Sequence, residues 1–181
     1  MDAFEHLVSE ILWAQGYWVR TSVKVALTKA EKVAIGRPSS PRWELDIVAY
    51  RGSDNSLLVV ECKSYLDSQG VKFSAFGGTD VKLAERFKLF NDAKLREVVL
   101  GRLGRQFHEC GACGPDPKIT LGLAAGQIYT DADRTSLKAL FDDQGWVLWD
   151  DVWLREHLQV MASGGYENNV AAIVSKLLLR R

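Results

Sequence analysis

Apolar positions in the N-terminal third of the chain first follow a helical spacing and then alternate with polar ones. The helical spacing covers residues 4–15 and ends at Gly16. Alternation over residues 17–26 and 43–50 predicts two strands, and four apolar residues open a further strand at 57–65. The run RGSDNS supplies turn chemistry, so the last two strands are expected to pair as a hairpin.

Helical and strand patterns alternate through the rest of the chain. Residues 81–108 have mostly helical spacing, with interruptions expected near Gly101 and Gly104. Their helix cap is expected at Thr79 or Asp80. The further elements expected are a strand at 118–128, a helix at 133–143, a short strand at 146–149, and helices near 152–161 and 166–179. This alternation predicts an α/β fold, in which helices flank a mixed sheet.

The composition fits a globular domain with a sizeable core. Of the 181 residues, 47% are hydrophobic, which argues against intrinsic disorder. We expect one domain over residues 1–150, with the helices of 151–181 packed on it. The 23 basic and 23 acidic residues cancel, so a globally basic coat for nucleic acid is excluded. Phosphate binding would therefore need a local patch.

Three features of the chain bear on its location. No apolar run approaches the ~20 residues of a membrane span. The first residues carry acids rather than the basic leader of a secretory signal. Three cysteines, an odd number, do not make a disulfide framework. The expected setting is therefore the reducing cytoplasm, with no membrane partner.

Two charged residues interrupt the apolar strand at 57–65 near its end. Glu61 and Lys63 are two positions apart and share one face of the strand, while Cys62 points to the other. Asp46 lies in the preceding strand, and pairing through the hairpin can bring it beside Glu61. Two adjacent carboxylates repel each other unless a cation lies between them. The pattern therefore predicts a cation site.

A hard divalent ion suits this pair of carboxylates. Mg²⁺ or Mn²⁺ takes a few carboxylate oxygens and leaves the other positions to water and substrate phosphate. Such an ion polarises a phosphodiester and helps to make hydroxide from water. Lys63 could hold the attacking water or stabilise negative charge on the phosphate. The alternative interpretation of Glu61 and Lys63 is a surface ion pair at a strand end, worth at most about 1 kcal/mol.

These motifs resemble those of a known family. The sequence ELD at 44–46 followed by ECK at 61–63 is similar to the signature of the PD-(D/E)xK nuclease superfamily, which has the restriction-endonuclease-like fold. The segments FEHLVSEILWAQGYWV and GWVLWDDVWLREHL resemble parts of archaeal-type Holliday junction resolvases and methyl-directed restriction enzymes. The resemblance covers residues 2–149, with Leu45 in place of the family's usual proline. It implies an αβββαβ core with a C-terminal helical extension, and the polar insertion at 27–41 lies outside that core.

The resemblance also implies roles for individual residues. Asp46 and Glu61 would be metal ligands, together with the backbone carbonyl of Cys62. Lys63 would act on water or on the phosphate. Glu5, in the first helix, would lie close to these residues, through water or a second ion.

Other acids, and another role for Glu5, are alternatives to these assignments. An acid at the exposed start of a helix is favoured by the helix dipole, which by itself would explain Glu5. Glu10 competes with Glu5 for the site role. Glu44 shares a strand face with Asp46 and is a candidate partner just outside the metal ligands.

Candidate phosphate contacts lie in two polar segments. Residues 82–105 hold seven basic and three acidic residues that do not fall on one helical face, so a phosphate surface and a solvated helix are both open. The insertion region, in which a short helix is expected before Gly36, adds Arg37 and Arg42. The FGG run at 76–78 is either a mobile loop over the cleft or a linker.

Cys110 and Cys113 form a C-x-x-C motif that follows His108. A structural zinc site needs four ligands, and no second C-x-x-C is present in the sequence. A thioredoxin-like motif would begin a helix after a strand, whereas this one follows a predicted helix. A zinc or redox protein built on these cysteines is a third hypothesis.

The leading hypothesis is a Mg²⁺- or Mn²⁺-dependent endonuclease that hydrolyses phosphodiester bonds in DNA, with a homodimer among its expected states. The alternative is a catalytically inactive module that keeps the nuclease fold and binds nucleic acid or another partner. Intact Asp46, Glu61 and Lys63 favour the enzyme, because a binding module does not need all three. Duplex, junction, single strand and RNA are all open as substrates.

Overall fold

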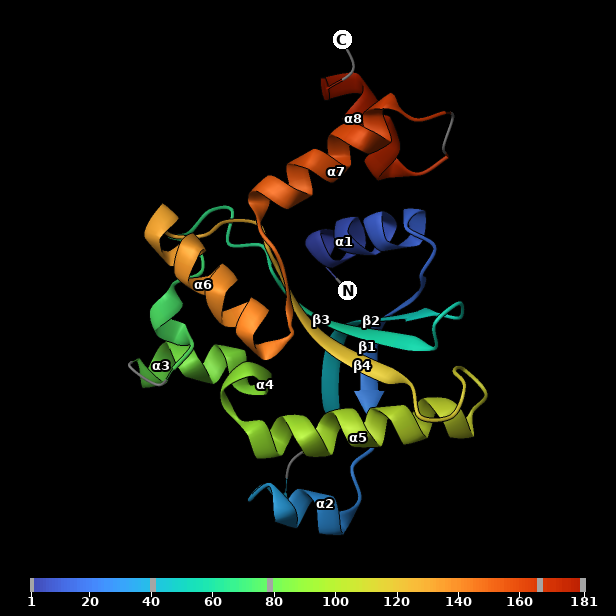
Figure 1. Ribbon diagram of the computed structural model, residues 1–181, viewed down its shortest axis with the longest axis vertical. Coiled ribbons are helices and arrows are strands. Elements are labelled where there is room, and N and C mark those ends of the chain that lie inside the picture. The colour runs from blue at the N-terminus through green and yellow to red at the C-terminus, as the bar shows by residue number, and fades with distance from the viewer. Residues whose placement is uncertain (1, 40–41, 78–79, 166–167, 180–181) are drawn as a thin grey trace.

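A five-stranded mixed sheet lies at the centre of the computed structural model (Figure 1), which describes residues 2–39, 42–77, 80–165 and 168–179. The first three strands are antiparallel neighbours, and β3, β4 and β5 run parallel to one another. The predicted α/β class, with helices flanking a mixed sheet, is confirmed, as is the β2–β3 hairpin. In spatial order the strands are β1 (Trp18–Val25), β2 (Trp43–Arg51), β3 (Ser56–Lys63), β4 (Lys118–Ala125) and β5 (Val147–Trp149).

Helices cover both faces of this sheet (Figure 1). On one face, α1 (Ala3–Ala14) and α7 (Asp151–Ser163) contribute buried apolar residues to the core. On the other face, α5 (Ala93–Glu109) and α6 (Asp131–Gln144) do the same. The sheet therefore separates two apolar clusters, and its central strands are buried on both sides.

The pattern of β3 follows from this position between two clusters. Leu57 and Val59 face the α5 side of the sheet, while Leu58 and Val60 face the α1 side. All four side chains are almost fully buried, which explains why the strand opens as a continuous apolar run rather than as an alternation. Polar residues can enter β3 only where its neighbours stop covering it.

Shorter helices connect the main elements. α2 (Lys29–Ala34) is the short helix predicted before Gly36, and Thr28 and Glu31 form its capping box. Asp80, one of the two residues predicted to cap this region, is the N-cap of α3 (Val81–Ala84). The other, Thr79, lies outside the described residues. The remaining short elements are η1 (Phe73–Ala75), η2 (Glu85–Phe87), α4 (Lys88–Asn91) and the last helix, α8 (Val170–Leu179).

The interruptions predicted near Gly101 and Gly104 are wrong, because α5 runs through both glycines without a break. A glycine inside a helix costs only about 1 kcal/mol relative to alanine, and Val99 and Leu103 bury this helix against the sheet. Gly104 is itself buried, and a Cβ there would approach the Ile119 side chain to 3.2 Å. The helical path breaks instead at Asp92, whose extended backbone and side-chain cap start α5.

The C-terminal helices are joined to the sheet by a buried acid. Asp150 follows β5, is only 2% exposed, and caps the first turn of α7 through the Trp153 N–H at 3.0 Å. Arg134 of α6 donates to the Asp150 carboxylate at 2.7 Å. Among the described residues, no helix combines the length and apolar character needed to cross a membrane.

Candidate functional site

The candidate site lies where β2 and β3 separate. The β2–β3 ladder ends with Ile47 opposite Val60. β3 then continues beside β4 alone, as far as Lys63 opposite Ala125. Beyond the last β2 pair, backbone and side-chain polar groups of β3 are no longer covered by β2. The fork sits at the carboxyl ends of the parallel strands, the edge at which α/β sheets usually bind ligands.

Asp46 bridges this fork. It directly precedes Ile47, and its Oδ2 accepts a hydrogen bond from the Cys62 N–H at 2.8 Å. On the other side of β2, the ladder to β1 pairs Thr21 with Ile47 and next pairs Val23 with Leu45. Ser22, which lies between these two pairs, has a left-handed φ of +52°. The regular strand geometry is thus interrupted on both sides of Asp46, and its half-buried carboxylate reaches across to the end of β3.

Glu61 and Lys63 share a face of β3, as the strand spacing predicted, and they form an ion pair. Lys63 Nζ lies 2.5 Å from Glu61 Oε1. The two side chains are 22% and 21% exposed, so the pair is neither buried nor a freely solvated surface contact. Lys63 Nζ also lies 6.0 Å from the centre of the buried Phe87 ring. The ammonium is therefore held between an acid and an aromatic face.

The charges at the fork interact. Burial raises the pKa of Glu61; the negative charges of Asp46 and Glu5 act in the same direction, while Lys63 opposes them. Burial would lower the pKa of Lys63, but the Glu61 carboxylate outweighs it, with help from Asp46, so the lysine pKa is raised. Three carboxylates and one ammonium thus share a poorly solvated edge, where an additional cation would reduce their repulsion.

Of the three further candidate acids, Glu5 is the one whose charge acts on Glu61. Glu5 is half-buried, and its Oε2 also accepts the Asp2 N–H, so it serves the capping box of α1 as well. Its charge nonetheless acts on Glu61 and Cys62. Glu10 faces His6 at 3.8 Å, and Glu44 is exposed. Neither is among the charges that raise the pKa of Glu61.

Cys62 points away from the charged face, as predicted. Its side chain is 9% exposed and packs in the cluster under α1. Burial raises the pKa of its thiol, and the surrounding carboxylates of Asp46, Glu5 and Glu61 raise it further. The thiol is therefore neutral and serves packing, and any role of this residue in the site belongs to its backbone.

A pocket of about 280 Å³ opens beside the ion pair. Phe87, which faces Lys63 Nζ, also lines this pocket. Tyr65 and Arg86 line it as well, with Arg86 Nη1 3.5 Å from the Tyr65 hydroxyl. The sequence reasoning did not single out Tyr65. Strand spacing does not predict its position, because β3 ends at Lys63 and Tyr65 has a left-handed φ of +43°.

Most of the basic residues in 82–105 have structural partners. Arg96 donates to the Leu89 and Phe90 carbonyls, and Arg102 donates to the Ala26 carbonyl. Lys94 pairs with Glu97 on an exposed helix face. Most of these basic side chains are therefore used in ion pairs or in hydrogen bonds to backbone carbonyls. Arg86 is the basic residue of this segment that lines the pocket beside Phe87.

The C-x-x-C motif lies apart from the fork, in the loop after α5. Cys113 is buried and packs in the core on the α5 side of the sheet, while Cys110 is exposed and contacts the Phe107 carbonyl. Within the described part of the chain, no three His, Cys, Asp or Glu side chains come together as a preformed metal cage. This holds for the cysteine loop and for the fork alike.

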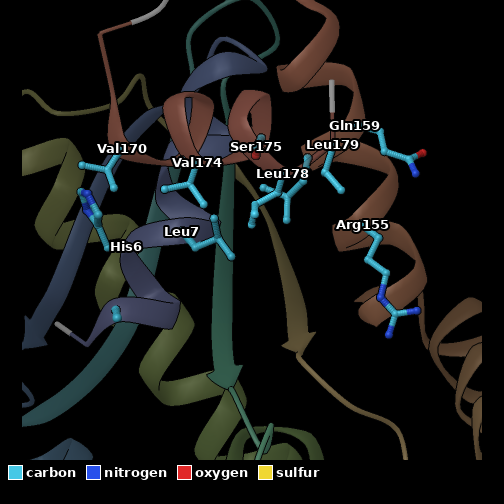
Figure 2. A pocket seen from close by; sticks show the side chains of 12 residues that line it. His6, Leu7, Arg155, Gln159, Val170, Val174, Ser175, Leu178 and Leu179 are labelled. Atoms are coloured by element: carbon cyan, nitrogen blue, oxygen red, sulfur yellow. The ribbon is translucent and has the colours of Figure 1, made fainter. Parts of the chain in front are cut away.

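A second pocket, with a volume of about 520 Å³, is lined by residues of α1, α7 and α8. Figure 2 shows the side chains that line it. His6 and Leu7 of α1 face Val170 and Val174 of α8 across it, and Arg155 lies at its edge. Its lining is mostly apolar and contains none of Asp46, Glu61 or Lys63. This pocket is therefore separate from the charged fork.

Asp46, Glu61, Lys63 and the backbone of Cys62 lie at the fork, and Glu5 is linked to it through the effect of its charge on Glu61. The assignment of these residues to a metal site stays a prediction. The homodimer and the division at residue 150 stay predictions. In comparisons with known proteins, no protein-family model, no curated protein and no solved structure matches this chain.

Proposed function

We propose that this chain is a metal-dependent nuclease of the restriction-endonuclease-like fold, which hydrolyses phosphodiester bonds in DNA. The observation that carries the proposal is the convergence of Asp46, Glu61 and Lys63 at one sheet edge, where Asp46 reaches across the fork to the backbone of β3. A strand end that served only solubility would not need two carboxylates and a lysine in partly buried positions.

The donor set at the fork fits a hard divalent cation. Asp46 and Glu61, with the backbone carbonyl of Cys62, would hold Mg²⁺ or Mn²⁺ through oxygen atoms alone. The described side chains include no group of three metal-ligating residues, so an ion held here would need water and phosphate oxygens as its remaining ligands. When bound, such an ion polarises the phosphodiester and lowers the pKa of a coordinated water.

Lys63 supplies the positive charge that the protein itself brings to the reaction. Its ammonium stays protonated, because the neighbouring acids hold its pKa above the ordinary value. It lies at the open edge of β3, on the same face as Glu61, and its position is fixed by the ion pair and by Phe87. From there it can donate to a phosphate oxygen or to the attacking water.

The test compares metal binding with cleavage in matched variants. Asp46→Asn and Glu61→Gln keep the side-chain shapes, and the asparagine amide of the first variant retains an oxygen that can accept the Cys62 N–H. We expect each variant to remove most Mn²⁺ binding in calorimetry and most Mg²⁺-dependent cleavage of labelled DNA duplexes, junctions and single strands. Asp54→Asn, an acid in the β2–β3 turn that pairs with Arg51, is the control and should change neither.

The outcomes separate the enzyme from the binding module. Unchanged Mn²⁺ binding in both site variants would contradict the metal assignment. Nucleic-acid binding by the wild type without cleavage of any of these substrates, with Mg²⁺ or Mn²⁺ present, would instead support the catalytically inactive module.

A further inference from the structure

The pocket beside Lys63 combines an apolar wall with a polar rim. Leu83 and the buried Phe87 form part of the wall. Tyr65, Gln69 and Arg86 bring hydroxyl, amide and guanidinium groups to the lining. Its volume of about 280 Å³ is the size of a single small ligand rather than of a peptide or a helix.

The position of the pocket ties it to the chemistry of the fork. Phe87 forms part of its wall and at the same time lies 6.0 Å from Lys63 Nζ. Tyr65 follows Lys63 by two residues and has a left-handed φ of +43°, which turns the chain out of β3 and toward the pocket. The pocket and the ion pair therefore have Phe87 as a common neighbour.

Two cations on the pocket lining favour an anionic ligand. Arg86 is exposed and donates to the Tyr65 hydroxyl, which leaves most of its guanidinium donors facing solvent. Lys72 lines the pocket, donates to Gln69 and lies 4.3 Å from the Tyr129 ring centre. Both positive charges are thus oriented by neighbouring side chains at the mouth of an apolar hollow, an arrangement that suits a phosphate joined to a flat apolar group.

We propose that this pocket binds one unpaired nucleotide next to the scissile phosphate, with its base against Leu83 and Phe87 and its phosphate on Arg86 and Lys72. This inference rests on the proposed nuclease function and names its substrate class. A base within a duplex is stacked and paired, so only an unpaired or extruded base can enter a hollow of this size. The site is therefore specific for single-stranded or frayed DNA.

Binding without catalysis tests the pocket independently of the metal. The protein is titrated, in EDTA, into a labelled single strand of about 12 nucleotides, a length within the range that single-strand sites cover. A blunt duplex of the same sequence is titrated in parallel, and binding is measured by fluorescence anisotropy. Arg86→Ala should weaken single-strand binding by about tenfold, the effect of losing one phosphate contact. Leu83→Trp should weaken it by a similar factor, because the indole would fill the pocket and exclude the base. Neither variant should change duplex binding by more than about twofold. Asp54→Asn, in the β2–β3 turn, should bind the single strand as the wild type does. Lys94→Ala, on the exposed face of α5, is the matched control for charge.

Each result decides one of the two proposals. Equal weakening on duplex and single strand, unchanged single-strand binding in Arg86→Ala, or no single-strand binding by the wild type would overturn the pocket assignment. Melting curves show whether Leu83→Trp is folded, and Arg86 is exposed, so its variant decides the question even if the tryptophan is not tolerated. Loss of cleavage in Asp46→Asn alongside unaffected pocket variants would leave the nuclease standing without this subsite.

Discussion

At the scale of single residues, Lys63 distinguishes a catalytic edge from a solvated strand end. The lysine is held by Glu61 at 2.5 Å and by the Phe87 ring, and it is 21% exposed. We expect Lys63→Ala to keep the fold and Mn²⁺ binding, because lysine is not a ligand, and to lower single-turnover cleavage by about a hundred- to a thousand-fold. Rates are measured at saturating Mn²⁺ on the best DNA substrate.

The control for Lys63 is an ion pair on an open helix surface. Lys94 and Glu97 pair on the surface of α5 and are 58% and 72% exposed. Lys94→Ala should leave cleavage unchanged, as expected for a surface pair worth at most about 1 kcal/mol. Equal cleavage rates in wild type and Lys63→Ala would assign Lys63 to this same class and remove the central residue of the mechanism.

The sequence predicts the acids of the site better than it predicts the pocket. Glu61 and Lys63 are two residues apart, and strand geometry alone places them on one face. Asp46 is brought near them by a hairpin whose turn residues can be identified in the sequence. Arg86 and Tyr65, by contrast, are 21 residues apart and belong to different elements, so their contact depends on how the chain after β3 folds back. No local sequence pattern predicts that contact.

At the scale of elements, two glycines that look alike in the sequence have opposite structural roles. Gly101 lies on the exposed side of α5, where a Cβ would meet only the Arg105 side chain at 3.8 Å, whereas a Cβ on Gly126 would overlap the Ser64 carbonyl oxygen. The Gly126 N–H also donates to the Lys63 carbonyl at 2.9 Å. Gly126 therefore permits the close approach of the ends of β3 and β4 beside the site.

This difference predicts opposite effects of alanine on stability. Gly101→Ala should raise the free energy of unfolding by about 0.5–1 kcal/mol, because alanine has the higher helix propensity. Gly126→Ala should lower it by about 1–3 kcal/mol through the clash with the backbone of Ser64, and should also reduce cleavage by displacing Lys63. Chemical denaturation of the two variants measures both effects. A stabilising Gly126→Ala would show that β3 and β4 do not approach as closely as described.

The element boundaries show where sequence patterns succeed and where they do not. The β2–β3 hairpin follows from alternation and turn residues, which act over a few positions. The break predicted near Gly101 and Gly104 is wrong, and the break that exists, at Asp92, depends on the capping carboxylate that starts α5. The parallel pairing of β3 with β4 joins segments that are far apart along the chain, and only tertiary packing decides it.

At the scale of the whole molecule, Asp150 connects the sheet, α6 and α7. Burial opposes the charge on Asp150, but the Trp153 N–H, the Arg134 ion pair and Lys138 outweigh it and hold its pKa below the ordinary value. The side chain is 2% exposed, and Arg134 lies 2.7 Å away. Removing this charge leaves Arg134 with Asp151 at 2.9 Å and the more distant Asp131. The arginine is thus only partly compensated.

Asp150→Asn should therefore destabilise the protein in a pH-dependent manner. Asparagine is a good N-cap, so the loss comes from the ion pairs and should be about 1–3 kcal/mol at pH 7, below the roughly 3–5 kcal/mol of a pair broken without any compensation. A carboxyl whose pKa is lower in the folded state stabilises that state above its unfolded value of 3.8, and this stabilisation disappears as the pH falls through the folded pKa. The difference between wild type and variant should stay constant from about pH 7 to about pH 5 and shrink below about pH 4.

The matched control for Asp150→Asn is Asp131→Asn, which removes a fully exposed acid 3.7 Å from the same arginine. It should change the free energy of unfolding by less than about 1 kcal/mol. Urea denaturation of the wild type and both variants between about pH 3 and pH 7 measures the two curves. A stability difference for Asp150→Asn that persists unchanged to about pH 3 would mean that the residue acts through its hydrogen-bond geometry alone. Its charge would then have no part in holding α6 and α7 to the sheet.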